Sequence, residues 1–448
     1  MYIKAIILLG DIDMDVNDEK KVDPTVETIA EMFPEEFLRT TARETGVVRR
    51  ERKIDPVILF WVLTLGFGVR FLSTIRELKR KYEEKAEVEL SISSFYDRFT
   101  PEMVDFLQRC MLHAIEFQAQ QPGRVLGDKL KRFKDLVIQD STIIRLHESL
   151  AKIWPAARSR KVAAGVKVSC VVSAVANSPK SVRIYPERTA EAKILRLGPW
   201  LKDCILLIDL GYFKYLFFDR IDRYGGYFVS RLKGNANPLI VGVNRKWRGN
   251  SVDVVGKRLR DVLPLLKREV LDVEVEVKFK RRKYKGKQST VNRRFRQVCI
   301  FNSESGKYHT YLTNIPVEIL SAEDIALLYG ARWEIELIFK ELKSHYRMDE
   351  IQSTNPEIVK CLIWVAILTL MCSRRIHRLI RNANPENANR YTSLRWAKVF
   401  TEQADRLLTE VLECMGLKLD MLTLYDICIG QGCDPNVKRE RLMERWVS

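Results

Sequence analysis

The sequence lacks the residue patterns that bind zinc or build a disulfide framework. Its nine cysteines include no C-x-x-C pair and no regular spacing, and its five histidines are scattered along the chain. A zinc site or a cysteine framework needs such residues at short, recurring intervals, so neither is indicated. We therefore expect buried free thiols in a reducing compartment.

Long apolar runs are also missing. The most apolar segment, CLIWVAILTLMC (361–372), lies between Lys360 and Arg374, and at about twelve residues it is too short to cross a bilayer. The opening MYIKAIILLGDIDMD has a brief apolar run that stops at acids and has no small-residue cleavage site. We predict a cytoplasmic protein with no membrane partner, in which 361–372 is a buried helix.

Acidic residues are too few to balance the basic ones. The chain has 448 residues with 76 Lys and Arg against 58 Asp and Glu, a net charge of +18. Such a balance favours a polyanionic partner, of which nucleic acid is the commonest. The segment KFKRRKYKGKQSTVNRRFR (278–296) has ten basic residues, no acid and three interleaved aromatic residues. A solvated hairpin tip is one interpretation, but we favour salt-dependent DNA contact.

Helical and strand patterns divide the chain. Residues 73–108 read as a helix, a short connection and a second helix that begins at Ser91 or Ser93, which fits either a DNA-reading helix-turn-helix or plain helix packing. β-Branched runs bounded by turn residues predict strands at 135–141, 165–175, 204–213 and 224–235. A helical segment at 187–197 separates the second strand from the third.

This order of elements indicates the α/β class with additions. The central strands are followed by a β-rich stretch with almost no helical periodicity, and the chain after about residue 385 is helical. The predicted regions are a helical N-terminal region that binds DNA (1–125), a core (126–235 and 317–384), a β-rich insertion (236–316) and a helical C-terminal region open to dimerisation (385–448).

The segment YGARWEIELIFKELKSH (329–345) predicts a helix with two different faces. Placed at about 100° per residue, its polar stripe consists of Tyr329, Arg332, Glu336, Lys340 and Lys343. A neighbouring apolar stripe would pack inward. Upstream, Ser321 and Asp324 have the spacing of a capping pair at the helix start. The Glu336 carboxylate lies on a stripe that otherwise carries an arginine and two lysines, which indicates a specific role for this acid.

Two strands end in an acid. Asp140 closes LVIQD, and Asp209 closes ILLID. Each residue alone is explained by a turn cap, but the carboxyl ends of strands in an open α/β sheet face the crevice where ligands bind. Together with Glu336 they form a set of three carboxylates, which would repel one another unless a cation lies between them. Hard divalent ions such as Mg²⁺ accept such oxygen ligands.

These residues carry a family resemblance. Tyr329, Arg332, Glu336 and Lys343 match Y-x2-R-x3-E-x6-K at every position, and the segments QDST, IDLGYF, GYFVSRLKGN and YLTNIP occur in order around them. In this the chain resembles the cut-and-paste DDE transposases of bacterial and archaeal insertion sequences. The resemblance covers roughly residues 130 to 350.

The resemblance implies an RNase H-like catalytic core that is interrupted by the β-rich insertion. Asp140, Asp209 and Glu336 would bind two Mg²⁺, with Mn²⁺ as a substitute. Hydrolysis would nick the DNA at the element's end, and the freed 3′-hydroxyl would form a hairpin and later attack target DNA. The implied partners are double-stranded DNA, as terminal inverted repeats and target, and a second copy of the chain in a homodimer.

The same resemblance assigns DNA contacts by position. Tyr329 and Arg332 would bind near the hairpin, and Lys340 and Lys343 would bind phosphates. Two further residues join the DNA-binding set. Arg231 lies in the GYFVSRLKGN segment, and Trp247 is the only tryptophan between 201 and 332 and so the candidate for stacking on a flipped base.

Three other functions remain open. One is an RNase H-like nuclease or resolvase without strand transfer, against which the signature helix argues. Another is a transposase-derived DNA-binding protein that no longer cuts, against which the presence of all three carboxylates argues. A basic RNA-binding protein would explain the charge but not the acids.

Overall fold

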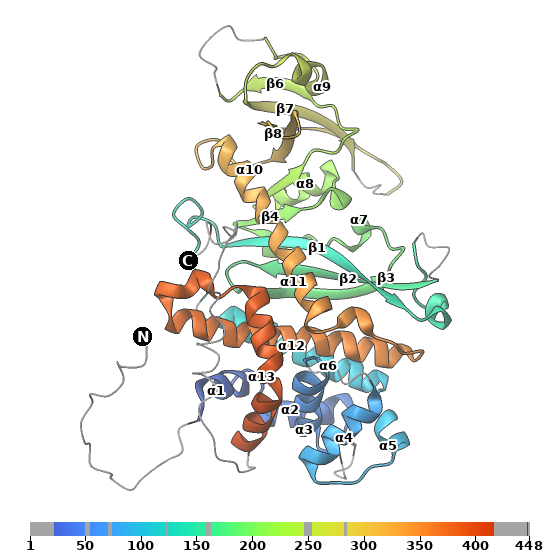
Figure 1. Ribbon diagram of the computed structural model, residues 1–448. Coiled ribbons are helices and arrows are strands. Elements are labelled where there is room, and N and C mark those ends of the chain that lie inside the picture. Colours follow the sequence, from blue (N-terminus) through green and yellow to red (C-terminus); the bar gives the residue numbers. More distant parts are fainter. Residues whose placement is uncertain are drawn as a thin grey trace, which may run out of the picture.

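The protein has a mixed α/β architecture built on one long sheet. The computed structural model (Figure 1) describes residues 22–49, 54–69, 74–121, 123–157, 163–245, 253–281, 285–415 and 446. Helices from the two ends of the chain form a layer on one side of the sheet, and the strands of residues 239–313 extend the sheet away from that layer.

The nine strands are ordered β3-β2-β1-β4-β5-β9-β8-β7-β6. β1 is antiparallel to β2 and parallel to β4, β4 is parallel to β5, and β5 is antiparallel to β9. The strands are β1 (Asp135–Leu146), β2 (Ala164–Ser173), β3 (Ser178–Pro186), β4 (Cys204–Ile208), β5 (Tyr227–Arg231), β6 (Leu239–Val243), β7 (Val270–Lys280), β8 (Thr290–Asn302) and β9 (Lys307–Thr313).

The four strands predicted in the middle of the chain are present as β1, β2, β4 and β5. The one predicted over 204–213 is shorter than expected, because it ends at Ile208 and Leu210–Tyr212 form a 3₁₀ turn. The pattern did not predict β3, whose sequence SPKSVRIYP contains two prolines. Proline is tolerated there because β3 is at the edge of the sheet, where one side needs no ladder hydrogen bonds. The helix expected over 187–197 is a single turn, α7 (Glu191–Ile194).

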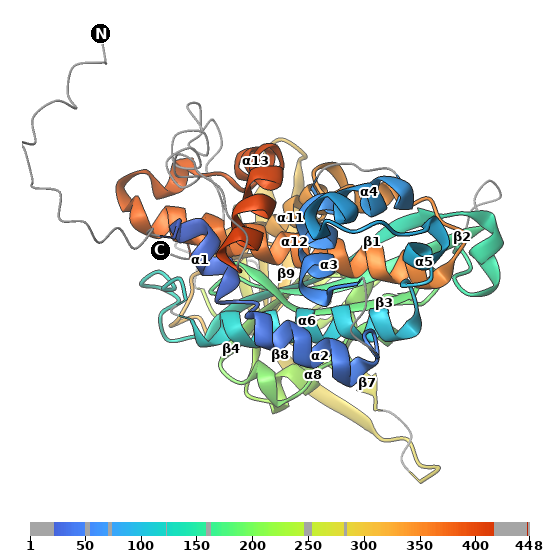
Figure 2. The same ribbon diagram turned by 90° about the horizontal axis from the view of Figure 1, so that it is seen from below.

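Two hydrophobic clusters cover the two faces of the sheet. Alternate residues of β1 divide between them: Leu136 and Ile138 belong to the cluster that includes the helical layer, and Val137 belongs to the cluster on the opposite face. The helical layer is visible from below (Figure 2). Its helices are α1 (Pro24–Ala30), α2 (Glu35–Thr45), α3 (Pro56–Trp61), α4 (Ile75–Ala86), α5 (Ile92–Tyr96), α6 (Pro101–Gln120), α12 (Pro356–Ala383) and α13 (Ser393–Cys414).

The helix pair predicted within 73–108 is present as α4 and α5. Ser91 is the N-cap of α5, because its hydroxyl accepts a hydrogen bond from the Ser94 N–H at 3.1 Å. The second helix is only one turn and a half long before α6 begins at Pro101. Its geometry leaves both the DNA-reading and the packing interpretation as predictions.

The apolar segment 361–372 lies within α12, as predicted, and every one of its residues is buried. By length and composition α12 is the one described helix that could span a bilayer, yet 83% of its most apolar window is covered by the rest of the protein. We conclude that α12 is a core helix. Of the seven described cysteines, all free, only Cys414 is exposed, which agrees with the expected thiols.

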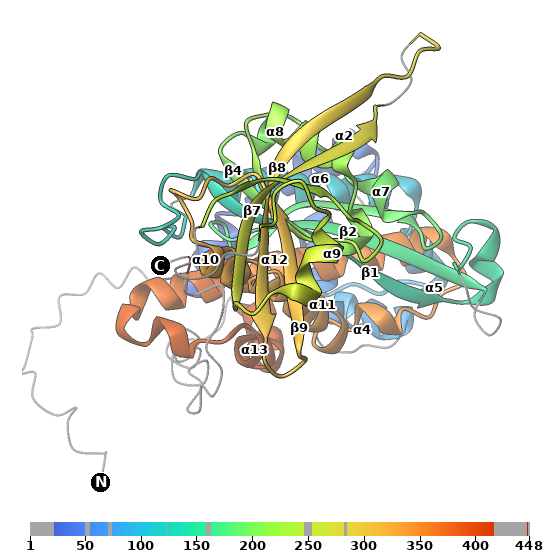
Figure 3. The ribbon, with the colours of Figure 1, turned by 90° about the horizontal axis from the view of Figure 1, so that it is seen from above.

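Residues 236–316 add strands to the same sheet. β9 pairs with β5 on one side and with β8 on the other, so the added strands continue the central ones without a break. A short helix, α9 (Leu259–Val262), packs beside them. The long hairpin of β7 and β8 projects from the molecule when it is seen from above (Figure 3).

Candidate functional site

The three candidate carboxylates come from three elements that meet where β4 ends. β1 pairs with β4 as far as Gln139 opposite Ile208, and Asp140 is the next residue of β1. Asp209 directly follows β4, and its carboxylate accepts a hydrogen bond from the Gly211 N–H at 3.2 Å. Glu336 lies in the first turn of α11 (Trp333–Ser344). Sheet topology and one helix therefore bring them together.

All three carboxylates surround the guanidinium of Arg332. Its Nη1 is 3.1 Å from Asp140 Oδ2, and its Nη2 is 2.7 Å from Glu336 Oε1. Its Nε lies 4.0 Å from Asp209 Oδ1 and is buried without a hydrogen-bond partner. Three negative charges thus face one positive charge, and one donor of that cation is unsatisfied. We refer to these four residues as the acid centre.

The pKa of Asp140 reflects its burial and the charges around it. The pKa of the Asp140 carboxyl is raised to about 6, chiefly by burial and in part by the negative charge of Asp209. The Ser141 N–H, which donates to Asp140 at 2.8 Å, and the charge of Arg332 act in the opposite direction. The centre is therefore short of positive charge even with Arg332 in place.

The donors of the acid centre fit a hard divalent cation in kind. Carboxylate oxygens are the ligands that Mg²⁺ and Mn²⁺ take up in proteins. Among the described residues, no three Asp, Glu, His or Cys side chains stand close enough together to hold a metal ion. In the acid centre the guanidinium of Arg332 occupies the space between the carboxylates, so a cation would take its place.

The single helix expected over 329–345 is two helices. α10 (Ala322–Gly330) ends before Arg332, and α11 begins at Trp333. At the junction several N–H groups bond to the carbonyl three residues back, as in Arg332 to Tyr329 (3.0 Å) and Glu334 to Ala331 (3.0 Å), which is a tight 3₁₀-type turn. This turn aims Arg332 at the acids, and the 3.6-residue pattern could not predict it.

The start of α10 is as predicted. Ser321 and Asp324 form a capping box, in which each side chain accepts from the other residue's N–H. Lys129 also donates to Asp324 at 2.7 Å. This end of α10 is therefore held from two sides, which fixes the helix that leads into the acid centre.

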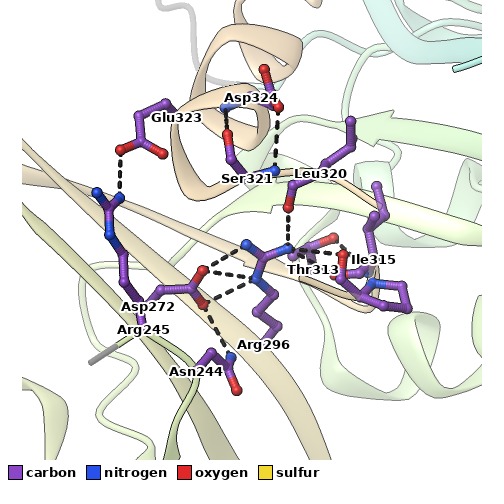
Figure 4. A network of polar contacts seen from close by, with 11 residues as sticks. Asn244, Arg245, Asp272, Arg296, Thr313, Ile315, Leu320, Ser321, Glu323 and Asp324 are labelled. Atoms are coloured by element: carbon purple, nitrogen blue, oxygen red, sulfur yellow. Dashed lines mark hydrogen bonds and ion pairs between the residues drawn. The ribbon is translucent and has the colours of Figure 1, made fainter. Parts of the chain in front are cut away.

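A buried arginine holds the loop before α10 (Figure 4). Arg296 of β8 pairs with Asp272 of β7 at 2.6 Å, and its Nη1 donates to the carbonyl oxygens of Ile315, Pro316 and Leu320. Leu320 immediately precedes the capping box. The β7–β8 hairpin is thus tied to the polypeptide that positions the acid centre.

Two predicted DNA contacts lie beside the acid centre. Tyr329 is buried with its hydroxyl unpartnered, and burial raises its pKa to about 12. Its ring lies 5.9 Å from the guanidinium carbon of Arg332. Arg231 is exposed at the end of β5, and its positive charge lowers the pKa of Tyr329, as a neighbouring cation would.

The remaining predicted contacts are placed differently. Lys343 donates to the Ile143 carbonyl at 2.8 Å, and burial lowers its pKa, so it is tied to β1. Lys340 is exposed on α11. Trp247 lies outside the described residues. Trp333 directly follows Arg332, is 54% exposed and has the exposed ring that base stacking requires.

A fourth carboxylate was missed. The charge of Glu191, the first residue of α7, raises the pKa of Asp140, and its carboxylate fills the space where a side chain at Gly211 would lie. Lys167 Nζ is 3.9 Å from it. No motif marks Glu191, because its approach to Asp140 depends on how α7 folds back over the sheet.

Part of the basic segment 278–296 is neutralised within the fold. Arg293 pairs with the fully buried Asp219 at 2.6 Å, and Arg281 contacts the same acid at 3.4 Å. Arg294 lies 3.6 Å from Glu274, and Arg296 is buried, as described above. The hairpin base is therefore a structural ion-pair region, and the prediction of DNA contact applies to the cations beyond it.

Comparison with known proteins identifies the family of this chain. Residues 131–372 match the family described as "Transposase DDE domain". The transposase of IS231F from Bacillus thuringiensis subsp. israelensis is 22% identical over 82% of both chains. The transposase of IS1151 from Clostridium perfringens is 22% identical over 80% of this chain and 81% of that one.

Two further similarities cover different extents. A putative transposase, InsL of IS186A from Escherichia coli (strain K12), is 37% identical over 17% of this chain and 20% of its own. The cryo-EM structure of the piggyBac transposase synaptic complex with hairpin DNA aligns with a TM-score of 0.45 and 10% identity over 94% of this chain and 87% of that one. Because the domain match spans more than half of the sequence, this chain belongs to the DDE transposase family.

Proposed function

We propose that this transposase binds the ends of its insertion sequence as double-stranded DNA, cuts them in a metal-dependent reaction and joins them to target DNA. The observation that carries the proposal is the acid centre, in which Asp140, Asp209 and Glu336 surround one guanidinium. Electrostatic repulsion among the three carboxylates raises the free energy of the folded protein. Unfavourable arrangements of charge like this one are typical of functional sites.

In this proposal the three carboxylates hold two Mg²⁺ ions, or Mn²⁺ in their place. Two such ions, when bound, activate the attacking oxygen and stabilise the leaving oxygen of a phosphodiester. The chain itself positions the DNA. Hydrolysis frees a 3′-hydroxyl at the element's end, and attack of that hydroxyl on a second phosphodiester joins the strands with release of the former 3′-oxygen.

Arg332 has two roles in this proposal. Without DNA it offsets part of the negative charge of the acid centre. With the charge of the acids neutralised, its planar guanidinium would be free to bind a DNA phosphate through paired N–H donors. Tyr329, with its unpartnered hydroxyl, and the exposed Arg231 adjoin the same space, and Lys340 offers a further cation to the backbone.

The proposed architecture is an RNase H-like core with a β-rich insertion at 236–316. Support comes from the mixed order β3-β2-β1-β4-β5, which brings the ends of β1 and β4 together at the acids. The helical ends, 1–125 and 385–448, are assigned to DNA binding and dimerisation. We propose a homodimer on DNA, as the family resemblance implies.

The test is cleavage of linear DNA that carries the gene's own flanking sequences. Wild type, Glu336→Ala and the exposed-acid control Glu318→Ala would be compared in Mg²⁺, in Mn²⁺ and in EDTA, with DNA binding measured in parallel. We expect cuts at the flank boundary with wild type and the control only, and binding by all three proteins.

The products distinguish the alternatives. Joining of the cut end to a supercoiled plasmid indicates a transposase, whereas cutting without joining indicates a nuclease. Tight and specific binding by wild type with no cutting in either metal would contradict the proposal and favour a DNA-binding protein that no longer cuts.

A further inference from the structure

A buried acid lies on the same helix as Glu336. α11 runs from the acid centre to the helical layer (Figure 1). Its buried residues are Ile335, Ile338, Phe339, Glu341 and Leu342. Glu341 is the one charged residue among them and has no exposed surface. It is five residues from Glu336, about 7.5 Å along the helix axis, so it is not a member of the acid centre.

Both oxygens of the Glu341 carboxylate have partners in the core. Oε2 forms an ion pair with Nη2 of Arg374, which is 3% exposed on α12. Oε1 accepts a hydrogen bond from the Tyr346 hydroxyl at 3.0 Å. Two directional contacts therefore hold this carboxylate in one orientation. We refer to Glu341, Tyr346 and Arg374 as the α11 anchor.

The partners of this carboxylate are themselves fixed by α12 and α13. Nη1 of Arg374 donates to the hydroxyl of Ser393, the first residue of α13, at 2.8 Å. The Tyr346 hydroxyl lies 2.7 Å from Ser373 Oγ, to which Trp396 Nε1 also donates at 2.9 Å. The α11 anchor thus ties α11 to two helices of the helical layer.

On its other side α11 is tied to the strand that carries Asp140. Lys343 Nζ donates to the carbonyl of Ile143, three residues beyond Asp140 on β1, at 2.8 Å. Lys343 is two residues after Glu341, which is about 200° around the helix. Contacts on opposite sides of a helix restrict its rotation more than either contact alone.

The beginning of α11, where Glu336 lies, has weaker support of its own. Its N-cap residue, Arg332, makes no side-chain capping hydrogen bond. The guanidinium of Arg332 links Glu336 to Asp140, but in the proposed function it turns from the acids to a DNA phosphate. After that change the position of Glu336 depends on how the rest of α11 is held.

Apolar side chains would hold α11 and α12 together equally well. Replacement of a buried ion pair by apolar residues of similar volume is often neutral or stabilising, so helix packing alone does not require the α11 anchor. Directional contacts add control of rotation. A turn of α11 by about 10° would move an atom about 6 Å from its axis by about 1 Å, and a misplacement of that size can lower a rate about a hundredfold.

We propose that Glu341 is a positioning residue, which fixes the rotation of α11 and thereby places the carboxylate of Glu336 in the acid centre. Arg374 and Tyr346 hold it in place. The inference rests on the proposed function and gives a role to an acid outside the proposed metal site. Because the α11 anchor is buried away from DNA, its loss affects metal affinity and the cleavage rate and leaves DNA affinity unchanged.

The test compares wild type with three variants. Tyr346→Phe removes one hydrogen bond of the α11 anchor and keeps the ring. Thr369→Val is its matched control, because the hydroxyl of Thr369 is buried on α12 and donates to the Thr64 carbonyl at 2.7 Å. The double variant Glu341→Leu/Arg374→Met removes both charges and leaves none unpaired. Thermal unfolding, Mn²⁺ affinity without DNA and the kcat and KM of DNA cleavage in Mg²⁺ would be measured for each protein.

We expect Tyr346→Phe and Thr369→Val to lower the thermal midpoint by similar amounts, about 1–3 °C each. Only Tyr346→Phe should also lower the Mn²⁺ affinity, by about threefold, and kcat, by about tenfold, with KM unchanged. The double variant should unfold within about 3 °C of wild type and yet lose about tenfold in Mn²⁺ affinity and about a hundredfold in kcat.

Tyr346→Phe with the Mn²⁺ affinity and kcat of Thr369→Val would overturn the proposal, because the α11 anchor would then contribute to stability alone. A stable double variant with wild-type Mn²⁺ affinity and kcat would overturn it as well. If the double variant does not fold, the comparison of Tyr346→Phe with Thr369→Val decides.

The same measurements separate this inference from the proposed function. Cleavage by wild type and equally by all variants removes the positioning role and leaves the transposase. A wild type that binds Mn²⁺ and never cuts, with weaker Mn²⁺ binding in Tyr346→Phe than in its control, removes the reaction and leaves the positioning role. A wild type that neither binds Mn²⁺ nor cuts contradicts both.

Discussion

Two arginines of this protein are both surrounded by oxygen atoms, yet their charges balance differently. Arg296 pairs with one acid, Asp272, at 2.6 Å, and backbone carbonyls take up the rest of its donors. Arg332 faces three carboxylates, and its Nε has no hydrogen-bond partner. Asp272 is 2% exposed and Arg296 6%, whereas the acid centre opens to solvent at Asp209 and Glu336.

This difference in charge balance distinguishes an arginine with a structural role, Arg296, from one in a candidate functional site, Arg332. A buried, one-to-one and fully hydrogen-bonded pair has little to gain from a further ligand. A centre with an excess of two negative charges gains from any cation that enters it. Four substitutions test this contrast, from the largest expected effect to the smallest.

Asp209→Asn removes one carboxylate of the acid centre, a proposed metal ligand, and keeps the shape of the side chain. We expect the rate of DNA cleavage in Mg²⁺ to fall about a thousandfold, since metal ligands contribute several kcal/mol to the transition state. The thermal midpoint should stay level or rise, because repulsion among the acids is relieved. Asp128→Asn, at an almost fully exposed acid, is the control. Undiminished cleavage by Asp209→Asn would remove this residue from the site.

Arg296→Met should lower the free energy of unfolding by about 3–5 kcal/mol, because Asp272 is left charged and buried. Urea unfolding measures the change. The double variant Asp272→Leu/Arg296→Met should recover most of the loss, since no unpaired charge remains. If the double variant were as unstable as the single one, the ion pair would not be the source of the stability.

Arg332→Ala should raise the affinity for Mn²⁺ in the absence of DNA by about tenfold, because the guanidinium no longer competes for the carboxylates. Electron paramagnetic resonance of free Mn²⁺ measures the affinity. Arg231→Ala, which removes an exposed cation nearby, should change it little. An unchanged affinity in Arg332→Ala would show that Arg332 and the metal do not share one space.

The smallest effect concerns the β7–β8 hairpin. Lys287→Ala removes an exposed cation with no ion pair among the described residues, and should reduce the slope of log affinity against log salt by about one unit. Arg294→Ala should reduce it less, because Glu274 already lies 3.6 Å from that guanidinium. Fluorescence anisotropy over a salt series gives both slopes, and equal slopes would mean that the internal pair does not matter.

Local patterns of the sequence predicted the pieces that depend on neighbours along the chain. The Ser321–Asp324 capping box, the buried helix at 361–372 and four central strands were read correctly, because caps and apolar periodicity act within a few residues. The missed strand β3 and the shortened α7 show the limit. Their conformations depend on the edge of the sheet and on packing over it.

The sequence by itself determined which chemical groups this protein has: three acids in order, a basic stripe and an excess of positive charge. Only the tertiary structure decided which charges meet. At the break between α10 and α11, Arg332 turns toward the acids. Arg296 and Arg293 form ion pairs with Asp272 and Asp219, which are distant from them in sequence. The physical reason is that electrostatic pairing follows distance in space, which sheet order and the alternation of side chains along β1 fix once the chain has folded.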